Sequence, residues 1–325
     1  MPVAAPMTVV SQSQMRLRVD EKRADPNFVY YCATAPDFLR QIHGNAIVAG
    51  VPHINLGILG KLEIPLPPLS RQKRIAKILG SLDDLIQSNT NAIGRFDAIG
   101  SLLLEREIQS LAALGDVLHE VPLSQAATLI EIGSRPRGGV KGFIAGVPSI
   151  GAESIRGIAQ FDFAKTKFVP YDFAVQMKRG VLTSRDVLVY KDGGKPGTFI
   201  PHVGMFGGGF PYNHMVINEH VYRVKGSPDF AEAYLYFWLK SQRMLDEMAV
   251  RGTGAAIPGL NSTAFKALPV ATPDSKMRMA LIPALDALVD ASLALALESK
   301  ELTSVRDELL PLLLSGRVSP GEAAA

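Results

Sequence analysis

The chain has 325 residues, of which 47% are hydrophobic and 20% charged, a balance typical of folded protein rather than of a disordered chain. Its single cysteine, Cys32, rules out an intramolecular disulfide and a cysteine-based zinc site, and agrees with a cytoplasmic location. The net charge of +3 permits nucleic-acid binding without arguing for it, and we expect neither a signal peptide nor a membrane span, because Gly, Pro and charged residues interrupt the apolar stretches.

An internal repeat organises the chain. Tyr30 corresponds to Tyr236 and Leu79 to Leu285, an offset of 206 residues that continues without gaps. The period is too long for a solenoid, so it indicates a duplicated unit of one domain followed by one helix. Each copy is expected to hold an aromatic-rich helix start (28–31 and 234–239), a Gly-rich turn (49–52 and 252–258) and a short strand (62–66 and 267–271) that prolines end.

The predicted segments follow the repeat. Residues 1–68 are expected to be the C-terminal part of a first domain, and residues 69–117 a first long helix. Residues 118–273 are dense in Gly, Pro and β-branched residues, which predicts a complete mixed α/β domain. A second long helix is expected over 274–318 and a flexible tail over 319–325. Strands are predicted within the second domain at 121–123, 180–182, 187–190 and 215–217.

Two heptad seams define the long helices. From Ile75 to Leu103, apolar residues recur in steps of four and three over roughly 30 residues, or about 45 Å of helix. A matching seam runs from Leu281 to Leu309, and its polar interruptions set a register at some cost in stability. Matched seams favour antiparallel pairing of the two helices. The alternative is that each helix packs on its own globular neighbour, and either face is also a candidate docking surface for a partner.

The fold class expected is therefore α+β, with mixed α/β recognition domains separated by two long antiparallel helices of the coiled-coil type. This arrangement, and the motifs that follow, resemble the specificity (S) subunit of type I restriction-modification systems. The stretch from Ile64-Pro-Leu-Pro-Pro-Leu to Leu82-Asp-Asp84 is similar to the family's junction between domain and helix. The opening and middle of the second domain are similar at Val121-Pro-Leu123, Gly133-Ser-Arg-Pro136, Gly146-Val-Pro-Ser-Ile150, Asp186–Gly193 and Asn218–Arg223.

The resemblance implies a non-catalytic DNA reader. It implies double-stranded DNA, modification (methyltransferase) subunits and a motor-nuclease restriction subunit as partners, and no membrane. The partner subunits would use S-adenosylmethionine, ATP and Mg²⁺, so no cofactor is expected in this chain. The family pattern has a complete first recognition domain, whereas this sequence begins inside it, near Ser11–Gln14. A truncated or split gene product, a fragment completed by another chain and a mis-called start all remain open.

Motifs for catalysis or metal binding are weak. Gly193-Gly-Lys-Pro-Gly197 has the wrong spacing for a phosphate-binding loop. Phe206-Gly-Gly-Gly-Phe210 lacks the Asn/Asp-Pro-Pro-aromatic partner of a base-modifying enzyme. Glu298-Ser-Lys300 has nuclease-like spacing but sits on a helix without an acidic partner, and the six histidines show no ligand spacing, so no metal site is expected.

A DNA reader needs cationic or amide groups on phosphates for position, and planar side chains on base edges for sequence. Loops of the second domain supply both types. The candidate DNA-binding residues are Ser134, Arg135, Arg137, Lys141, Lys191, Lys195, Asn213, His214, Arg251 and Thr253. For each one alone, a solvated loop residue is the competing interpretation.

The helices carry the expected second function, docking and helix packing. The candidate residues are Arg71, Lys73, Arg74, Ile75, Leu79, Leu82, Asp83, Asp84, Ile86, Leu281, Leu285, Leu288, Leu295, Leu302 and Leu309. For the charged members a plain solvated helix face is the equal alternative.

Three function classes compete. The leading hypothesis is a specificity subunit that directs methylation and restriction to a DNA target. The second is an interaction remnant that docks the modification subunit without productive DNA readout. A stand-alone methyltransferase or nuclease lacks its motifs. Self-pairing of two chains through their helices is a further possibility.

Overall fold

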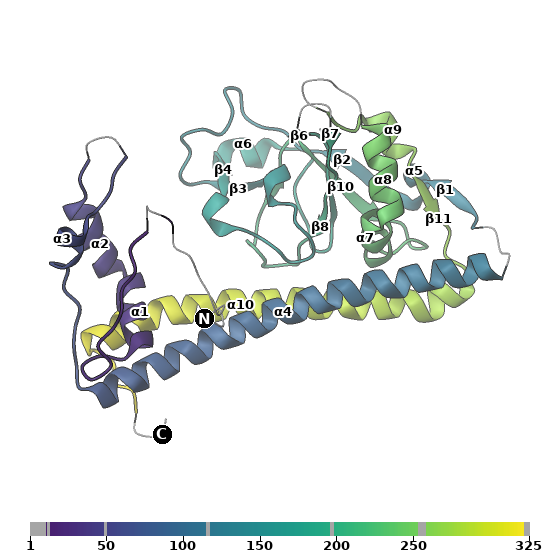
Figure 1. The fold of residues 1–325 in the computed structure, drawn as a ribbon. Coiled ribbons are helices and arrows are strands. Elements are labelled where there is room, and N and C mark those ends of the chain that lie inside the picture. The colour runs from purple at the N-terminus through teal and green to yellow at the C-terminus, as the bar shows by residue number, and fades with distance from the viewer. Residues whose placement is uncertain are drawn as a thin grey trace. The chain divides into compact units, whose positions relative to one another are not determined.

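The structure is a computed structural model and describes residues 11, 14–48, 51–114, 118–195, 198–252 and 258–321. The chain forms two compact units. Unit 1 comprises residues 1–88 and 301–325, and unit 2 comprises residues 89–300. Two long helices contribute to both units, so each unit joins a globular part to a section of the helix pair (Figure 1).

The described part of unit 1 is mainly helical. Asp25 caps its first helix by accepting hydrogen bonds from the backbone N–H groups of Asn27 and Phe28, both at 3.0 Å, and Pro26 occupies the first helical turn. The aromatic-rich segment at 28–31 therefore forms a helix, as predicted. The helices of this unit are α1 (Pro26–Thr34), α2 (Pro36–Asn45), α3 (Leu56–Leu59), the first part of α4 (Leu69–Ala113) and the end of α10 (Ile282–Ser315).

The core of unit 1 forms where α1 packs on the two long helices. Phe28 and Cys32 of α1 are buried with Leu79 of α4 and Leu310 of α10. A polar contact accompanies them. The hydroxyl of Tyr31 donates to Asp83 at 2.6 Å, and Arg306 donates to the other carboxylate oxygen at 2.7 Å.

Unit 2 is built around an antiparallel sheet of four strands in the order β2-β10-β5-β8. A three-stranded sheet β4-β3-β9 and the two-stranded pairs β1-β11 and β6-β7 complete it. The strands are β1 (Glu120–Pro122), β2 (Ala127–Ile132), β3 (Val147–Ile150), β4 (Lys167–Val169), β5 (Val187–Tyr190), β6 (Gly194–Lys195), β7 (Thr198–Phe199), β8 (Val203–Met205), β9 (Val216–Ile217), β10 (Val221–Gly226) and β11 (Pro269–Ala271). The helical elements are α5 (Leu123–Ala126), η1 (Ala152–Ser154), η2 (Phe163–Lys165), α6 (Tyr171–Gln176), α7 (Glu232–Lys240), α8 (Gln242–Arg251), α9 (Ser262–Lys266) and the π-helical turn η3 (Met277–Leu281) before α10.

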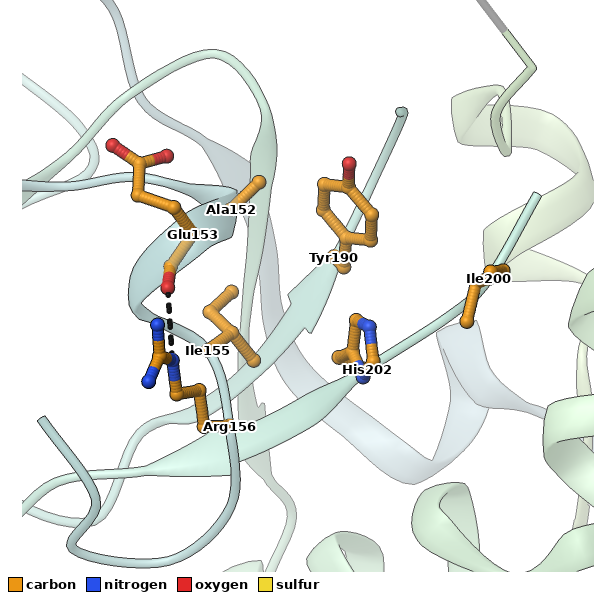
Figure 2. A pocket seen from close by; sticks show the side chains of 7 residues that line it. All are labelled: Ala152, Glu153, Ile155, Arg156, Tyr190, Ile200 and His202. Carbon is orange, nitrogen blue, oxygen red and sulfur yellow. Dashed lines mark hydrogen bonds between the residues drawn. The ribbon is translucent and has the colours of Figure 1, made fainter. Parts of the chain in front are cut away.

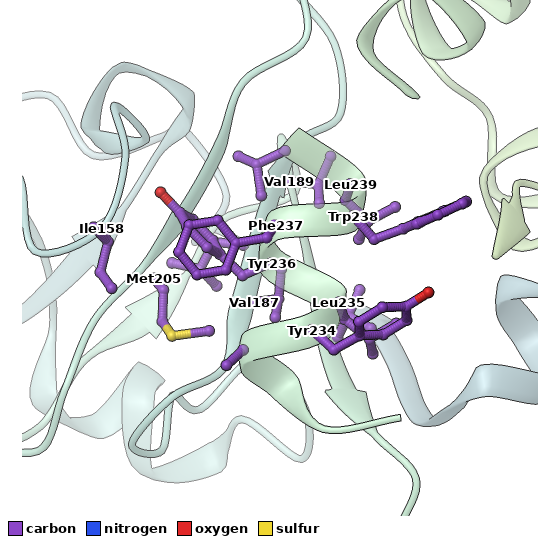
Figure 3. Packing of buried hydrophobic residues seen from close by; sticks show 14 of the residues in the cluster. Ile158, Val187, Val189, Met205, Tyr234, Leu235, Tyr236, Phe237, Trp238 and Leu239 are labelled. Atoms are coloured by element: carbon purple, nitrogen blue, oxygen red, sulfur yellow. The ribbon is translucent and has the colours of Figure 1, made fainter. Parts of the chain in front are cut away.

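Helix α7 is the centre of the unit 2 core. All seven residues from Ala233 to Leu239 are at most 2% exposed, and α7 packs on β5, β8 and β10 (Figure 3). The two tyrosine hydroxyls still find partners, because Tyr234 donates to the carbonyl of Ala271 and Tyr236 to Asp97 of α4, at 2.8 and 2.9 Å. Burial raises the pKa of both hydroxyls, so they remain protonated donors.

A buried ion cluster fixes the middle of the four-stranded sheet. Arg223 of β10 donates to Asp186 and to Glu131 of β2, each at 2.7 Å, and to the hydroxyl of Thr183 at 3.1 Å. Desolvation lowers the pKa of Arg223, but the hydrogen bond that it donates to Asp186 and the charge of that carboxylate outweigh this effect, so the net shift is upward. The guanidinium is therefore charged and paired inside the fold.

The two long helices run antiparallel within each unit, as predicted. In unit 2, Asn89 of α4 donates to Glu298 of α10 at 2.9 Å, and Glu107 pairs with Lys276 at 2.7 Å. Residue 89 of α4 therefore lies beside residue 298, and residue 107 lies beside residue 276. In unit 1, the contact of Asp83 with Arg306 continues the same order.

The predicted seam of α4 lies on the inner face, whereas that of α10 is shifted. Val289, Ala296 and Leu310 are buried, while their seam neighbours Leu288, Leu295 and Leu309 are only half-buried. In unit 2 α10 also faces the strand-containing part, since a side chain at Gly207 would meet Leu293, and Arg185 pairs with Asp286 and Asp290. The helix therefore buries a wider stripe than a two-helix seam.

Two strand predictions are wrong. Residues 62–66 form no strand, although the corresponding segment forms β11. The difference has a physical cause, because β11 pairs with β1, and no described segment of unit 1 pairs with 62–66. Residues 180–182 form only an isolated bridge, between Val181 and Val216. The predictions at 121–123, 187–190 and 215–217 fall on β1, β5 and β9.

One helical run is more apolar than we expected. By length and composition alone, Met277–Ser315 could cross a membrane, although Pro283, Asp286 and Asp290 interrupt the run. Packing accounts for part of this apolar character, because Leu281, Leu285 and Val289 belong to the unit 2 core. The same stretch carries Asp286 and Asp290, which pair with Arg185.

Candidate nucleic-acid interface

One end of the four-stranded sheet gathers the loops that carry polar candidates. Ile132 at the end of β2 lies opposite Tyr222, Val221 at the start of β10 lies opposite Tyr190 at the end of β5, and Val189 lies opposite Val203 at the start of β8. Because neighbouring strands are antiparallel, the loops after β2 and β5 and before β10 and β8 meet at the same end. We call it the loop end; it comprises residues 133–141, 191–193, 200–202 and 218–220.

Close backbone contacts hold the loop end together. The N–H of Gly133 donates to the carbonyl of Asn218 at 3.2 Å, and the N–H of Lys191 donates to that of His220 at 2.9 Å. A Cβ atom at position 133 would lie 1.7 Å from the carbonyl oxygen of Ile217, so only glycine fits. The sequence Gly133-Ser-Arg thus turns away from the sheet at a fixed point.

A chain of ionic side chains crosses the loop end. Arg135 contacts Glu219 at 2.6 Å, and the Nε2 of His220 lies 3.4 Å from the same oxygen. The Nδ1 of His220 contacts Asp192, which also accepts from Lys191 at 2.7 Å. Two cations, two carboxylates and one imidazole from three loops therefore form one network.

The network sets the charge of Asp192. Burial alone would raise its pKa, but hydrogen bonds from Lys191 and His220 and their charges lower it overall. The carboxylate is consequently ionised at neutral pH, and it fixes the ammonium of Lys191 and the ring of His220. The Arg135 side chain remains 55% exposed despite its contact with Glu219, so it can still reach a ligand.

Beyond Arg135 the same loop carries two exposed cations. Arg137 and Lys141 flank Gly138 and Gly139, whose φ angles are +86° and +82°, and Gly142 follows at +97°. L-amino acids with side chains rarely adopt this region, so the glycines define the turn. Among the described residues neither cation has an acidic partner within 4 Å.

Two hollows border this end of unit 2. One, of about 490 Å³, is lined by Glu153, Arg156, Tyr190, His202 and neighbouring apolar side chains. Figure 2 shows the rings of Tyr190 and His202 side by side. Their centroids lie 5.9 Å apart. Desolvation lowers the pKa of His202, so its imidazole is mainly neutral at pH 7.

The second hollow, of about 390 Å³, is more basic. Arg179, Lys191 and Lys266 line it together with Asn261 and other residues. Neither Arg179 nor Lys266 has an ion-pair partner among the residues that the structure describes. The hollow therefore extends the positive surface from the loop end over β2 and β10.

The predicted DNA-binding residues do not all come together. Ser134, Arg135, Arg137, Lys141 and Lys191 lie at the loop end. Asn213 and His214 are exposed. They follow β8, which begins at the loop end and leads away from it toward Gly209. The carbonyl of Gly209 accepts a hydrogen bond from Lys300 of α10. These two residues are therefore at the opposite end of the sheet.

The remaining predicted positions are structural or lie outside the description. Arg251, the last residue of α8, pairs with Glu247 at 2.6 Å and donates to the carbonyl of Ala267 at 3.0 Å, so part of its guanidinium is already bonded within unit 2. The backbone of Lys195 belongs to β6, but its side chain lies outside the described residues, as does all of Thr253.

The sequence reasoning assigned no role in DNA recognition to three members of the network, Asp192, Glu219 and His220. Acidic residues did not fit the expected pattern of a cationic reader. The signal available was the segment Asn218–Arg223, which had been noted as a motif without a role for its side chains.

The helix candidates divide by burial. Ile75, Leu79, Leu281 and Leu285 are buried, while Leu82, Ile86, Leu288, Leu295, Leu302 and Leu309 are half-buried. Asp83 is held by Tyr31 and Arg306. Lys73 and Asp84 are exposed, whereas Arg71 and Arg74 are half-buried. The exposed pair stays a prediction for partner docking.

Comparison with known proteins shows what the chain is similar to. Residues 4–94 match the type I restriction modification DNA specificity domain. The chain is also 20% identical, over 95% of its own length and 74% of the relative's, to the specificity subunit of the type I restriction enzyme MjaVIII from Methanocaldococcus jannaschii. The chain is thus similar to type I specificity subunits, and residues 4–94 carry the DNA specificity domain of that family. The domain match falls on unit 1 and α4, so it covers the first copy of the repeat rather than the loop end of unit 2.

Two solved structures are similar to this chain. The HsdS subunit from Thermoanaerobacter tengcongensis is 17% identical, with 93% of this chain and 73% of that one covered and a TM-score of 0.37. The S subunit of a type I system from M. genitalium is 16% identical, with 91% and 74% covered and a TM-score of 0.49.

Proposed function

We propose that this chain reads double-stranded DNA through the loop end of unit 2 and directs the modification and restriction subunits of a type I complex to the site. The supporting observation is that three loops converge on one end of a rigid sheet and present Arg135, Arg137, Lys141 and Lys191 there. Sites on loops held by a rigid scaffold are the usual location of binding residues.

The side chains at the loop end suit the two tasks of a DNA reader. Arg137 and Lys141, exposed on a glycine turn, are placed to neutralise phosphates. Arg135 is held at its Nε by Glu219, which leaves its terminal nitrogens for a base edge. Lysine and arginine contacts to phosphate give position, and the bidentate guanidinium contact gives sequence.

Partner subunits supply the chemistry in this proposal. The chain itself acts as a non-catalytic, cytoplasmic subunit without a cofactor, and S-adenosylmethionine, ATP and Mg²⁺ belong to the methyltransferase and motor-nuclease partners. Exposed polar positions of α4, such as Lys73 and Asp84, provide the docking surface.

Salt-dependent DNA binding tests the proposal. The full chain, co-expressed with its modification subunit, is titrated with target and random-sequence duplexes at several salt concentrations. We expect Arg135→Ala to cost about 1–3 kcal/mol on the target and to relax specificity, and Lys141→Ala to weaken all duplexes alike while reducing the salt slope by about 1. Arg106→Ala, which removes an exposed cation of α4, is the control.

Two outcomes would oppose the proposal. If the complex assembles but binds every duplex equally, the chain docks its partners without reading sequence. If Arg135→Ala and Arg106→Ala bind alike, recognition lies elsewhere on the chain.

A further inference from the structure

The two copies of the repeat differ in how well the same positions are covered. Tyr236 is fully buried in unit 2, whereas its counterpart Tyr30 is 47% exposed in unit 1. Four more fully or almost fully buried residues of unit 2 have half-buried counterparts. These pairs are Leu260 with Ile54, Phe265 with Leu59, Leu268 with Leu62 and Val270 with Ile64. Among the described residues, the first copy therefore has the less covered face.

The structure of unit 2 shows what such a face packs against. Strand β1 pairs antiparallel with β11, placing Val121 opposite Val270, and α5 packs on α9 and β11. Leu123 of α5 is completely buried. The covering piece is thus an extended Val-Pro segment followed at once by a helical turn.

In unit 1, residues 62–66 correspond to β11, and their backbone has one hydrogen-bonded edge and one open edge. Glu63 exchanges two hydrogen bonds with the side-chain amide of Gln41, both at 2.9 Å, just as the carbonyl of its counterpart Pro269 accepts from Trp238. On the other edge, the N–H groups of Ile64 and Leu66 have no hydrogen-bond partner among the described residues. This is the edge that β1 occupies in unit 2.

The hydrogen-bond register of β1 with β11 can be carried across the offset. In unit 2, the N–H of Leu123 donates to the carbonyl of Leu268, and the N–H of Thr272 donates to that of His119, both at 2.8 Å. The counterparts of Leu268 and Thr272 are Leu62 and Leu66. A strand of the β1 type would therefore bond to Leu62, Ile64 and Leu66, and leave Glu63 with Gln41.

An apolar groove lies beside residues 63–65. It has a volume of about 240 Å³ and is lined by Cys32, Phe38, Ile64, Pro65 and Leu314 among others. Cys32 takes the position that Trp238 fills in unit 2. The smaller side chain fills less of this place, so there is room for a side chain from outside the unit.

We propose that this groove binds a strand of a separate polypeptide, with the Val-Pro-Leu character of residues 121–123, as an added antiparallel strand along residues 62–66. Strand addition to a free edge draws affinity from backbone hydrogen bonds and selectivity from the side-chain groove. Such a partner completes the first copy of the repeat in the way that β1 and α5 complete the second.

A peptide experiment on the full chain tests the inference without any DNA. The probe is a fluorescent peptide with the sequence of residues 118–130. We expect saturable binding with a Kd below about 1 mM and slower hydrogen exchange at the amides of Ile64 and Leu66. Ile64→Glu in the protein removes an apolar wall of the groove and is expected to weaken binding at least tenfold. Val51→Glu, at an 84% exposed position outside the groove, is the matched control.

Peptide variants test the register and cannot unfold the protein. Residue 121 faces Val270 in a hydrogen-bonded pair, whereas residue 120 belongs to the adjacent pair that is not hydrogen-bonded. Val121→Pro in the peptide removes a bonded N–H and should reduce binding at least tenfold. Glu120→Pro removes an outward N–H and should leave binding within about twofold.

Three results would overturn the inference. One is the absence of binding at millimolar peptide. Another is protection that appears only at β11, which would mean that the peptide exchanges with β1 of unit 2. The third is concentration-dependent protection of residues 62–66 without peptide, which would identify a second copy of this chain as the occupant.

Discussion

Helices α1 and α7 occupy equivalent positions of a duplicated sequence, yet only α7 is enclosed. Every residue from Ala233 to Leu239 is buried, whereas α1 exposes Tyr30 to solvent. The same contrast separates β11 from residues 62–66, which have similar sequences and different backbones. A helix can satisfy its own backbone and so forms in both copies, but a strand requires a neighbour.

The largest expected difference between the two copies is the loss of stability when Tyr236 or its counterpart Tyr30 is replaced. Tyr236→Ala should destabilise unit 2 by about 3–5 kcal/mol, because it leaves a cavity under the sheet and removes a hydrogen bond to Asp97. Tyr30→Ala should cost unit 1 less than about 1 kcal/mol. Trp238, the only tryptophan, reports unfolding of unit 2 by fluorescence, and labelling of the buried Cys32 reports opening of unit 1. Equal losses would show that Tyr30 is covered.

A smaller effect is expected from the hydroxyl that ties α1 to the long helices. Tyr31→Phe removes the hydrogen bond to Asp83, which should destabilise unit 1 by about 1–2 kcal/mol and speed labelling of Cys32. Burial raises the pKa of the Cys32 thiol to about 12, so the thiol reacts only after opening. Trp238 fluorescence should not change. If Cys32 labelling were unchanged too, Asp83 would be satisfied by Arg306 alone.

The smallest effect concerns pH and the loop end. The pKa of Asp192 in the folded chain lies below its ordinary value of 3.8, so its ionised form stabilises unit 2. This contribution is complete above about pH 4 and is lost as the pH falls through the lowered pKa. Asp192→Asn should therefore cost less than about 1 kcal/mol at pH 7 and less still at pH 3, measured by denaturant unfolding. A constant cost would assign the effect to packing.

Much of the helical architecture was predictable from the sequence. The seams of α4 and α10 follow directly from apolar spacing, and their antiparallel order follows from chain connectivity. What sequence reasoning could not give was the shift of the buried stripe to Val289 and Ala296, because it depends on the recognition domain that packs against α10.

The candidate interface was only partly predictable. The sequence allowed Arg135, Arg137 and Lys141 to be predicted, because glycines next to cations mark turns that leave a sheet. Asp192 and Glu219 were not, because their role depends on loops from three distant segments meeting at one place. Arg251 has the same charge as Arg135, and only the structure shows that it is committed to Glu247.

The order of synthesis gives the helix pair a further consequence. The partners Asp83 and Arg306 are separated by 223 residues, and Asn89 and Glu298 by 209, so the pair closes only after the recognition domain has left the ribosome. The apolar stretch of α10 emerges after α4 has already been made. Because α4 is already present, the apolar stretch of α10 can pack on it soon after synthesis, which shortens the time for which that stretch is exposed to other chains.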